Sequence, residues 1–497
     1  RNDPRGGGME EIDVEMNVIR DFARRVLLSE ETFQEDGNTF VNMFSGEWSG
    51  TSKLNKYDLS SMYFNYAGSI YSQNFPIIDI VMNTMLKQEE STQGRHFFRM
   101  FNGMGDDQRA AAYLNGKSFE QAVLDNTLST EVFYEMMKLK GVYLRNYINS
   151  RLSSNEFKEF MAEFMKKYQF QEVNFTRLNS EFIRKFHFNL MDFIPNWYTI
   201  NSTPRFIVKG VDADQVEIGD YTKYIVKFQV YNPTNVEGVI SVNVEEGGGM
   251  FPGGPRGRRG RAAQMESKPA KNYIIEPRKY KEIRILCDER PSNLTINTNI
   301  SQNLPSTIMQ NFAKVTTTTT DTVTGIFDSN AALFTFNPKE ITVDNEDPGF
   351  RIIESNQKNK LQSFFKKESE DKYKNLNFWM PPSKWTATIG VNYYGDYINS
   401  AVYKKSGSGS NKTEWTTQIQ IPGFYEVFVY TSELPMMGWR RRGSEEKKMQ
   451  YYTVKHDDGE EEISVETGRG RQGWMTLGSF YFSAGEAKIT LSDKGSE

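Results

Sequence analysis

The chain has 497 residues, 38% hydrophobic, 13% aromatic and 25% charged, with a formal net charge of -4. This length predicts about three domains, and the nearly balanced charge excludes an overall field that would recruit nucleic acid or acidic lipid. No run approaches about 18 apolar residues, so we expect membrane association only through a segment outside this chain. The single cysteine, Cys287, excludes an intramolecular disulfide, and we expect an inert buried thiol.

Residues 1–203 are predicted to form an α-helical domain. Helical spacing places Val132, Met136, Leu139 and Tyr143 on one stripe after a start at Ser129 or Thr130. Ser153 and Glu156 have the spacing of a capping box before a face made by Phe157, Phe160, Met161 and Phe164. A third helix is predicted from about Asn174. Short helices with short connections indicate an α-helical array.

The pattern changes at Pro204, and residues 204–345 predict a β-sandwich. Short strand-like runs alternate there with turn residues, and Ile341-Thr342-Val343 is predicted as one more strand. Residues 346–376 are expected to form a charged connector. For the Gly- and Arg-rich stretch 247–261 we expect a flexible hairpin insertion, with RNA binding as the alternative. Asp344 to Gly349 are expected to form a capped turn, with calcium binding as the alternative.

Residues 377–497 predict a second, jelly-roll-like β-sandwich. Strand-like runs cover Phe424–Tyr430, Tyr451–His456, Gly473–Phe482 and Gly485–Ser492. The predicted fold class is therefore a multidomain α + β protein with an N-terminal α-helical array, a middle β-sandwich and a C-terminal jelly-roll-like β-sandwich.

The helical segment resembles the region after the zinc site in gluzincin aminopeptidases of the aminopeptidase N type. The matching residues are Lys140-Gly141-Val142-Tyr143, Phe157 to Tyr168, and the exit Phe193 to Tyr198 with Thr203 to Phe206. The zinc motif of that family, H-E-x-x-H, needs two histidines one helical turn apart. The three histidines here, His96, His187 and His456, do not have that spacing. We therefore assign no catalytic residue, metal ligand or cofactor to this chain, and zinc is expected only with an upstream catalytic segment.

The last quarter resembles the carbohydrate-binding-like module at the C-terminus of golvesin and of xanthan lyases. The motifs are Gly423-Phe424-Tyr425-Glu426-Val427, Tyr452 to His456 with Asp458-Gly459, Gly473-Trp474-Met475-Thr476-Leu477-Gly478, and Ala487 to Leu491. The stretch from Trp439 to Gly443 departs from this pattern as an insertion.

Aromatic side chains are the candidate ligand-binding residues, because the apolar face of a sugar ring fits a flat aromatic surface. We select Trp439, Trp415 and Tyr394 as platforms, whereas Trp474 and Trp385 are expected to fill the core of the sandwich. The surrounding loops are the expected recognition surface.

Three functions are compatible with these observations. The first is a non-catalytic binding or scaffold portion of a larger aminopeptidase-like protein, whose C-terminal module recognises a glycan, a peptide or a partner subunit. The second is the C-terminal part of an active zinc aminopeptidase with its zinc motif upstream of Arg1, and the third is a polysaccharide-binding accessory protein. The chain starts at Arg1 without Met, so we expect an upstream segment of the same precursor. The resemblances imply a cell-envelope, periplasmic or extracellular location.

Overall fold

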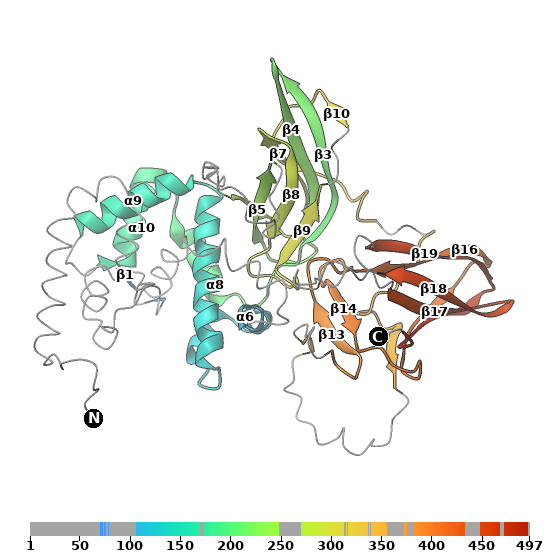
Figure 1. Ribbon diagram of the computed structural model, residues 1–497. Coiled ribbons are helices and arrows are strands. Elements are labelled where there is room, and N and C mark those ends of the chain that lie inside the picture. Colours follow the sequence, from blue (N-terminus) through green and yellow to red (C-terminus); the bar gives the residue numbers. More distant parts are fainter. Residues whose placement is uncertain are drawn as a thin grey trace, which may run out of the picture. The chain divides into compact units, whose positions relative to one another are not determined.

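The computed structural model describes residues 70–72, 74–75, 78, 106–168, 173–247, 270–312, 315, 317–335, 337, 339–354, 372–374, 381–432, 448–467 and 472–495 (Figure 1). The chain forms two compact units. Among the described residues, the first unit contains 70–78 and Tyr113–Ser202, and the second contains 106–112 and the residues from Thr203 onward. Helices precede the boundary at Thr203 and two β-sandwiches follow it. The predicted fold class, a multidomain α + β protein, is confirmed.

Helices dominate the described residues before Thr203. They are α6 (Asp106–Leu114), α7 (Phe119–Leu124), α8 (Thr130–Asn149), α9 (Ser154–Lys167), α10 (Phe175–Phe186), the 3-10 turn η3 (Leu190–Asp192) and α11 (Ile194–Thr199). Two short strands, β1 (Ile70–Tyr71) and β2 (Val173–Asn174), pair in parallel. No helix in the described part of the chain is both long and apolar enough to cross a membrane.

The predicted helix starts are confirmed by their caps. The Ser129 hydroxyl accepts a hydrogen bond from the Val132 amide at the start of α8. Ser153 and Glu156 satisfy each other's backbone amides as a capping box at the start of α9. Such caps pair amides that lack partners within the helix. The helices then bury aromatic faces, as where the rings of Phe160 and Phe182 meet edge to face with centroids 5.2 Å apart.

The middle β-sandwich consists of two mostly antiparallel sheets. One has the strand order β10-β3-β4-β7-β11 and the other β6-β5-β8-β9. The strands are β3 (Ile207–Ile218), β4 (Tyr221–Tyr231), β5 (Gly238–Glu246), β6 (Lys271–Ile275), β7 (Tyr280–Cys287), β8 (Pro291–Asn297), β9 (Thr307–Asn311), β10 (Thr318–Thr319) and β11 (Gly325–Asp328).

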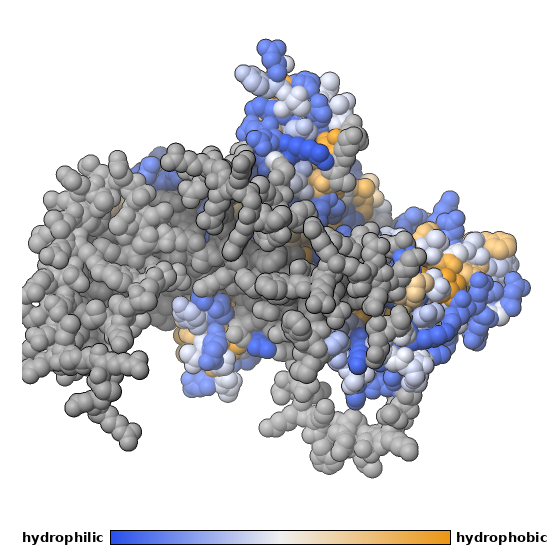
Figure 2. Space-filling model, viewed as in Figure 1, coloured by the Kyte–Doolittle hydropathy of each residue, from blue (hydrophilic) through white to orange (hydrophobic). Residues whose placement is uncertain are grey.

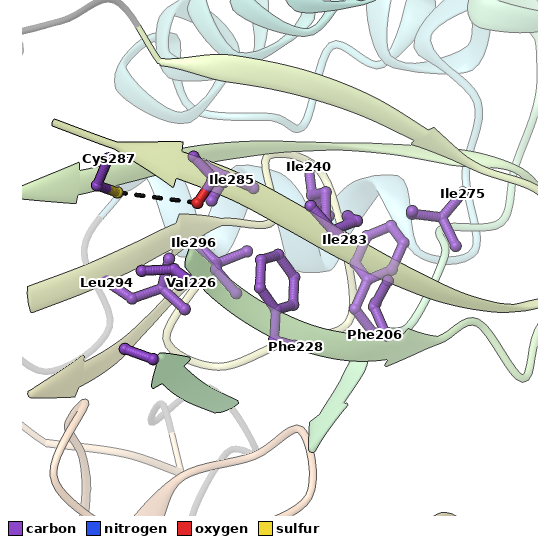
Figure 3. Close-up of a cluster of buried hydrophobic side chains, with 13 residues drawn as sticks. Phe206, Val226, Phe228, Ile240, Ile275, Ile283, Ile285, Cys287, Leu294 and Ile296 are labelled. Carbon is purple, nitrogen blue, oxygen red and sulfur yellow. Dashed lines mark hydrogen bonds between the residues drawn. The ribbon is translucent and has the colours of Figure 1, made fainter. Parts of the chain in front are cut away.

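The core of this sandwich lies between its sheets and is built from branched and aromatic side chains (Figure 3). Phe206, Phe228 and Ile240 are fully buried there. The Cys287 thiol is also fully buried, which confirms the burial predicted for this residue. Stretch 247–261 falls within the connection between β5 and β6, which are antiparallel neighbours. The hairpin position predicted for the stretch is therefore confirmed, although residues 248–269 lie outside the described part.

The strand predicted at Ile341-Thr342-Val343 is wrong. Ile341 and Thr342 are exposed, and the segment pairs with no strand of the described structure. The chain instead turns at Asp344, whose amide donates to the Asp347 carboxylate at 2.8 Å and whose carbonyl accepts from the Asp347 amide. The capped turn is confirmed, and a strand forms only after it, where a partner is available.

The C-terminal β-sandwich packs a five-stranded sheet, β12-β15-β20-β17-β18, against a two-stranded sheet, β16-β19. A small hairpin, β13-β14, accompanies them. The strands are β12 (Phe350–Ile353), β13 (Thr386–Ile389), β14 (Ser400–Tyr403), β15 (Lys412–Ile419), β16 (Gly423–Thr431), β17 (Lys448–His456), β18 (Gly459–Thr467), β19 (Gly473–Phe482) and β20 (Gly485–Ser492). The core includes Val427, Val454, Leu477, Phe480 and Leu491.

A buried ion pair fixes the last described strand to a neighbouring loop. Lys404 and Asp493 pair through side chains that are almost fully buried. The Asp493 carboxylate also accepts from the Gly409 amide at 2.7 Å and from the Asn411 side chain at 2.9 Å. Burial acts to raise the pKa of Asp493, but the hydrogen bonds from these partners outweigh it and hold the pKa below its ordinary value.

Candidate functional site

The outer face of the β16-β19 sheet carries most of the exposed aromatic side chains of the C-terminal sandwich. Side chains of a strand alternate between two faces, so Val427 points into the core while its neighbours in β16 point outward. The outward residues of β16 are Phe424, Glu426, Phe428 and Tyr430. In the space-filling view, hydrophobic residues lie among hydrophilic ones over the strands of this sandwich (Figure 2).

An irregularity in β19 decides which aromatic residues of that strand face outward. Val427 pairs with Gly478, but the next residue, Phe428, pairs with Thr476, so Leu477 is an extra residue in β19. Such a bulge reverses the alternation of side chains beyond it. Trp474 on one side of Leu477 and Tyr481 on the other therefore both face solvent.

The prediction that Trp474 fills the core is wrong, because 49% of its surface is exposed. Phe480 and Phe482 are buried, and strict alternation backward from them would place position 474 on the core side. Because β19 contains the extra residue Leu477, the side chain at position 474 points to solvent instead.

Trp474 forms an aromatic cluster with Tyr430 and Tyr394. Its ring centroid lies 5.1 Å from that of Tyr394 and 5.5 Å from that of Tyr430, both edge to face. The Tyr394 and Tyr430 centroids are 5.5 Å apart. Aromatic contacts of this kind hold the rings in fixed orientations. The cluster thus presents a half-exposed indole beside two tyrosine rings.

The loop that carries Tyr394 is held tightly beside β16. The Asn392 carbonyl accepts from the Ser432 hydroxyl at 2.9 Å and from the Tyr430 hydroxyl at 3.5 Å. Gly395 adopts φ +151°, and a Cβ there would lie 1.9 Å from the Ile398 carbonyl oxygen. Only glycine fits this close backbone approach, so the loop geometry that presents Tyr394 depends on it.

The hydroxyls of the cluster remain protonated at neutral pH. Burial raises the pKa of Tyr430 above its ordinary value. Burial also raises the pKa of Tyr394, and the negative charge of Asp396 adds to this effect, while a hydrogen bond with Thr342 opposes it. Both phenols are therefore neutral and can donate and accept hydrogen bonds.

A second pair of exposed aromatics lies at the other end of the same sheet. Phe424, which is 77% exposed, pairs across the strands with Tyr481, and their ring centroids are 5.3 Å apart. Between the two ends, Glu426 lies opposite Ser479 and Phe428 lies opposite Thr476. The outer face thus consists of two aromatic ends separated by a middle part with polar and aromatic groups. We call the outward side chains of β16 and β19, together with Tyr394, the aromatic face.

Of the platforms predicted from sequence, only Tyr394 is placed on the aromatic face. Trp415 is half-buried on β15, packs against the sandwich core and contacts the ring of Phe350 with centroids 5.3 Å apart. Trp439 lies outside the described residues. Trp385 is half-buried against the core, as expected. Sequence reasoning missed Tyr430 and Phe424, although their alternation with Val427 in one strand was a signal that both lie on the face opposite the core.

The described histidines occupy ordinary structural positions. His187 ends α10 in a left-handed conformation, with φ 54°, and is exposed. The His456 ring packs near Phe480, with centroids 5.0 Å apart, and its Nδ1 accepts from the Asp458 amide. His96 lies outside the described residues. Among the residues that the structure describes, no group of three His, Cys, Asp or Glu is placed to hold a metal ion.

Residues 374–497 match the family model of the Golvesin C-terminal domain. Residues 374–497, which contain the strands of the C-terminal β-sandwich from β13 to β20, therefore correspond to a Golvesin C-terminal domain within a multidomain α + β protein, and this part of the predicted resemblance is confirmed. No curated protein matches the sequence of the chain significantly.

Two solved structures show a distant likeness. A Paenibacillus xanthan lyase has 13% identity and a TM-score of 0.22, with 59% of this chain and 25% of that chain covered. Aminopeptidase A of Legionella pneumophila, in complex with aspartic acid, has 16% identity and a TM-score of 0.22, with 48% and 26% covered. This chain thus spans about a quarter of each. At these TM-scores the likeness supports no argument about activity.

Proposed function

We propose that the chain is a non-catalytic binding portion of a larger aminopeptidase-like cell-envelope protein, and that its Golvesin C-terminal domain binds a glycan through the aromatic face. The observation that carries this proposal is the half-exposed indole of Trp474, held by Tyr394 and Tyr430. A sugar ring has an apolar face that packs on an aromatic ring, and hydroxyls that exchange hydrogen bonds with neutral phenols. The cluster offers both kinds of contact.

The rest of the proposal concerns the organisation and location of the protein. We assign residues 1–203 to a helical domain, 204–345 to the first sandwich, 346–376 to a connector that contributes β12 to the following sandwich, and 377–497 to the glycan-binding module. The match to the Golvesin C-terminal domain supports a location outside the cytoplasm, and we propose the cell envelope, the periplasm or the extracellular space. The helical domain and first sandwich would then bind a protein partner or an upstream segment of the same precursor.

The test is binding of the purified full chain to a glycan array, followed by titration of the glycans that bind. We expect Trp474→Ala to weaken binding at least tenfold, or about 1.4 kcal/mol. Tyr221→Ala is the matched control, because this tyrosine is 74% exposed at the start of β4 in the other sandwich. The proposal is wrong if no glycan binds, or if the Trp474 and Tyr221 variants behave alike.

A further inference from the structure

The aromatic face is long and narrow. Phe424 and Tyr430 are six residues apart in β16, which corresponds to about 20 Å along a strand. The width is that of two strands, about 10 Å. Aromatic rings lie at both ends, and Phe428, 46% exposed, lies between them. A single sugar ring would contact only one of these positions.

The size of the face argues against a protein as its occupant. A strip of about 10 by 20 Å offers about 200 Å², whereas a stable protein interface buries about 800 Å² on each partner. The exposed carboxylate of Glu426 lies in the middle of the strip, where a protein interface would be expected to be free of charge. A narrow, hydroxyl-bearing chain matches both features, because it can pack on the rings and donate hydrogen bonds to Glu426 and Ser479.

From these dimensions we infer that the aromatic face binds the interior of an extended glycan chain that runs along β16 and β19. This inference rests on the proposed function and adds the class of ligand: a linear polysaccharide of several contiguous sugar units, bound at several subsites. The subsites are the Tyr394–Tyr430–Trp474 cluster at one end and the Phe424–Tyr481 pair at the other. Glu426 lies between them and accepts hydroxyl hydrogen bonds.

The test is calorimetric titration of the full chain with cello-, xylo-, manno- and chito-oligosaccharides of one to six units. For the series of oligosaccharides that binds, we expect the affinity to rise at least tenfold from the disaccharide to the longest oligomer. Phe424→Ala should remove most of this rise while changing disaccharide affinity less than twofold. Glu426→Gln should lower affinity for the long oligomers only, and Tyr221→Ala should change nothing.

The outcomes separate the inference from the proposed function. If short and long oligomers bind equally and Phe424→Ala has no effect, the extended site is wrong but a single sugar site at Trp474 stands. If none of the oligosaccharide series and no glycan of the array binds, both the extended site and the proposed glycan-binding function are wrong. Light scattering of the same samples tests another occupant: a wild-type dimer that Phe424→Ala converts to a monomer would show that the face joins two copies, and would overturn the inference.

Discussion

The buried amine of Lys140 provides a quantitative test of the energetics of the helical unit. Lys140 lies in α8 and is only 4% exposed. Its Nζ donates a hydrogen bond of 2.5 Å to the Trp197 carbonyl and lies 5.7 Å from the ring centroid of Phe119. Burial lowers the pKa of Lys140 from 10.5 to about 7, because the charged form loses its hydration.

This pKa shift makes stability depend on pH with a definite sign. Above pH 10.5 the amine is neutral in both states and imposes no penalty. As the pH falls towards 7, the unfolded chain takes up a proton that the folded chain does not, so the unfolded state is favoured. The penalty reaches about 4 kcal/mol at pH 7 and about 2 kcal/mol at pH 9, from about 1.4 kcal/mol per pKa unit.

The perturbation is Lys140→Met, which keeps the length of the side chain and removes the titrating group. The variant leaves the Trp197 carbonyl without this donor, at a cost of about 1–3 kcal/mol. Removal of the larger penalty at pH 7 should still make the variant more stable than the wild type, by about 1–3 kcal/mol. By pH 9 about 2 kcal/mol of this advantage should be gone.

The assay should report local unfolding, because the chain has more than one folding unit. Met136 in the same helix is fully buried, so hydrogen peroxide oxidises it only when the unit opens. Peptide mass spectrometry of Met136 oxidation against urea, at pH 7 and pH 9, gives both unfolding curves. Lys138→Met is the control, because its ammonium pairs with Glu135 at the partly exposed side of α8. Parallel pH dependence in wild type and Lys140→Met would refute the reasoning.

Three further predictions concern the C-terminal sandwich and the turn at Asp344 that precedes it. Asp493→Ala should destabilise the sandwich by about 3–5 kcal/mol in urea unfolding followed by limited proteolysis, because it leaves the buried Lys404 charge unpaired. Burial raises the pKa of Asp344 to about 6, because the charged carboxylate loses its hydration. The protonated carboxyl therefore contributes stability that is present at low pH and lost as the pH rises through 6. Asp344→Asn should raise the Tm at pH 7 and abolish its increase between pH 7 and pH 5. Gly395→Ala should displace Tyr394 and weaken glycan binding, with little change in far-ultraviolet circular dichroism.

Two of these predictions have a control variant, and the Asp344 prediction has an outcome that would refute it. Asp458→Ala removes an exposed carboxylate near the β17-β18 turn and should leave the unfolding curve within about 0.5 kcal/mol. If it destabilises as much as Asp493→Ala, the ion pair is not the cause. An Asp344→Asn variant with an unchanged pH profile would exclude this carboxyl as the titrating group. Gly423→Ala, where a Cβ meets nothing within 4 Å, should bind glycan normally.

Local patterns predicted the elements whose ends are set by neighbouring residues. The caps at Ser129 and Ser153, and the buried stripe of α9, follow from hydrogen bonds and spacing within a single helix. The β16 strand was predicted for the same reason, since its alternation is local. The strand expected at Ile341 failed because a strand needs a partner, and β-branched residues alone do not provide one.

The sequence by itself determined the change from helices to strands near Pro204, the presence of the golvesin-type module and the choice of Tyr394 as a candidate ligand-binding residue. The tertiary structure decided that Trp474 faces solvent, because the extra Leu477 in β19 shifts the pairing of two strands and reverses one side-chain alternation. It also decided which aromatics share a face, since Tyr394, Tyr430 and Trp474 come from three segments and meet only when those segments pack. Such a surface depends on pairing register, which no single segment encodes.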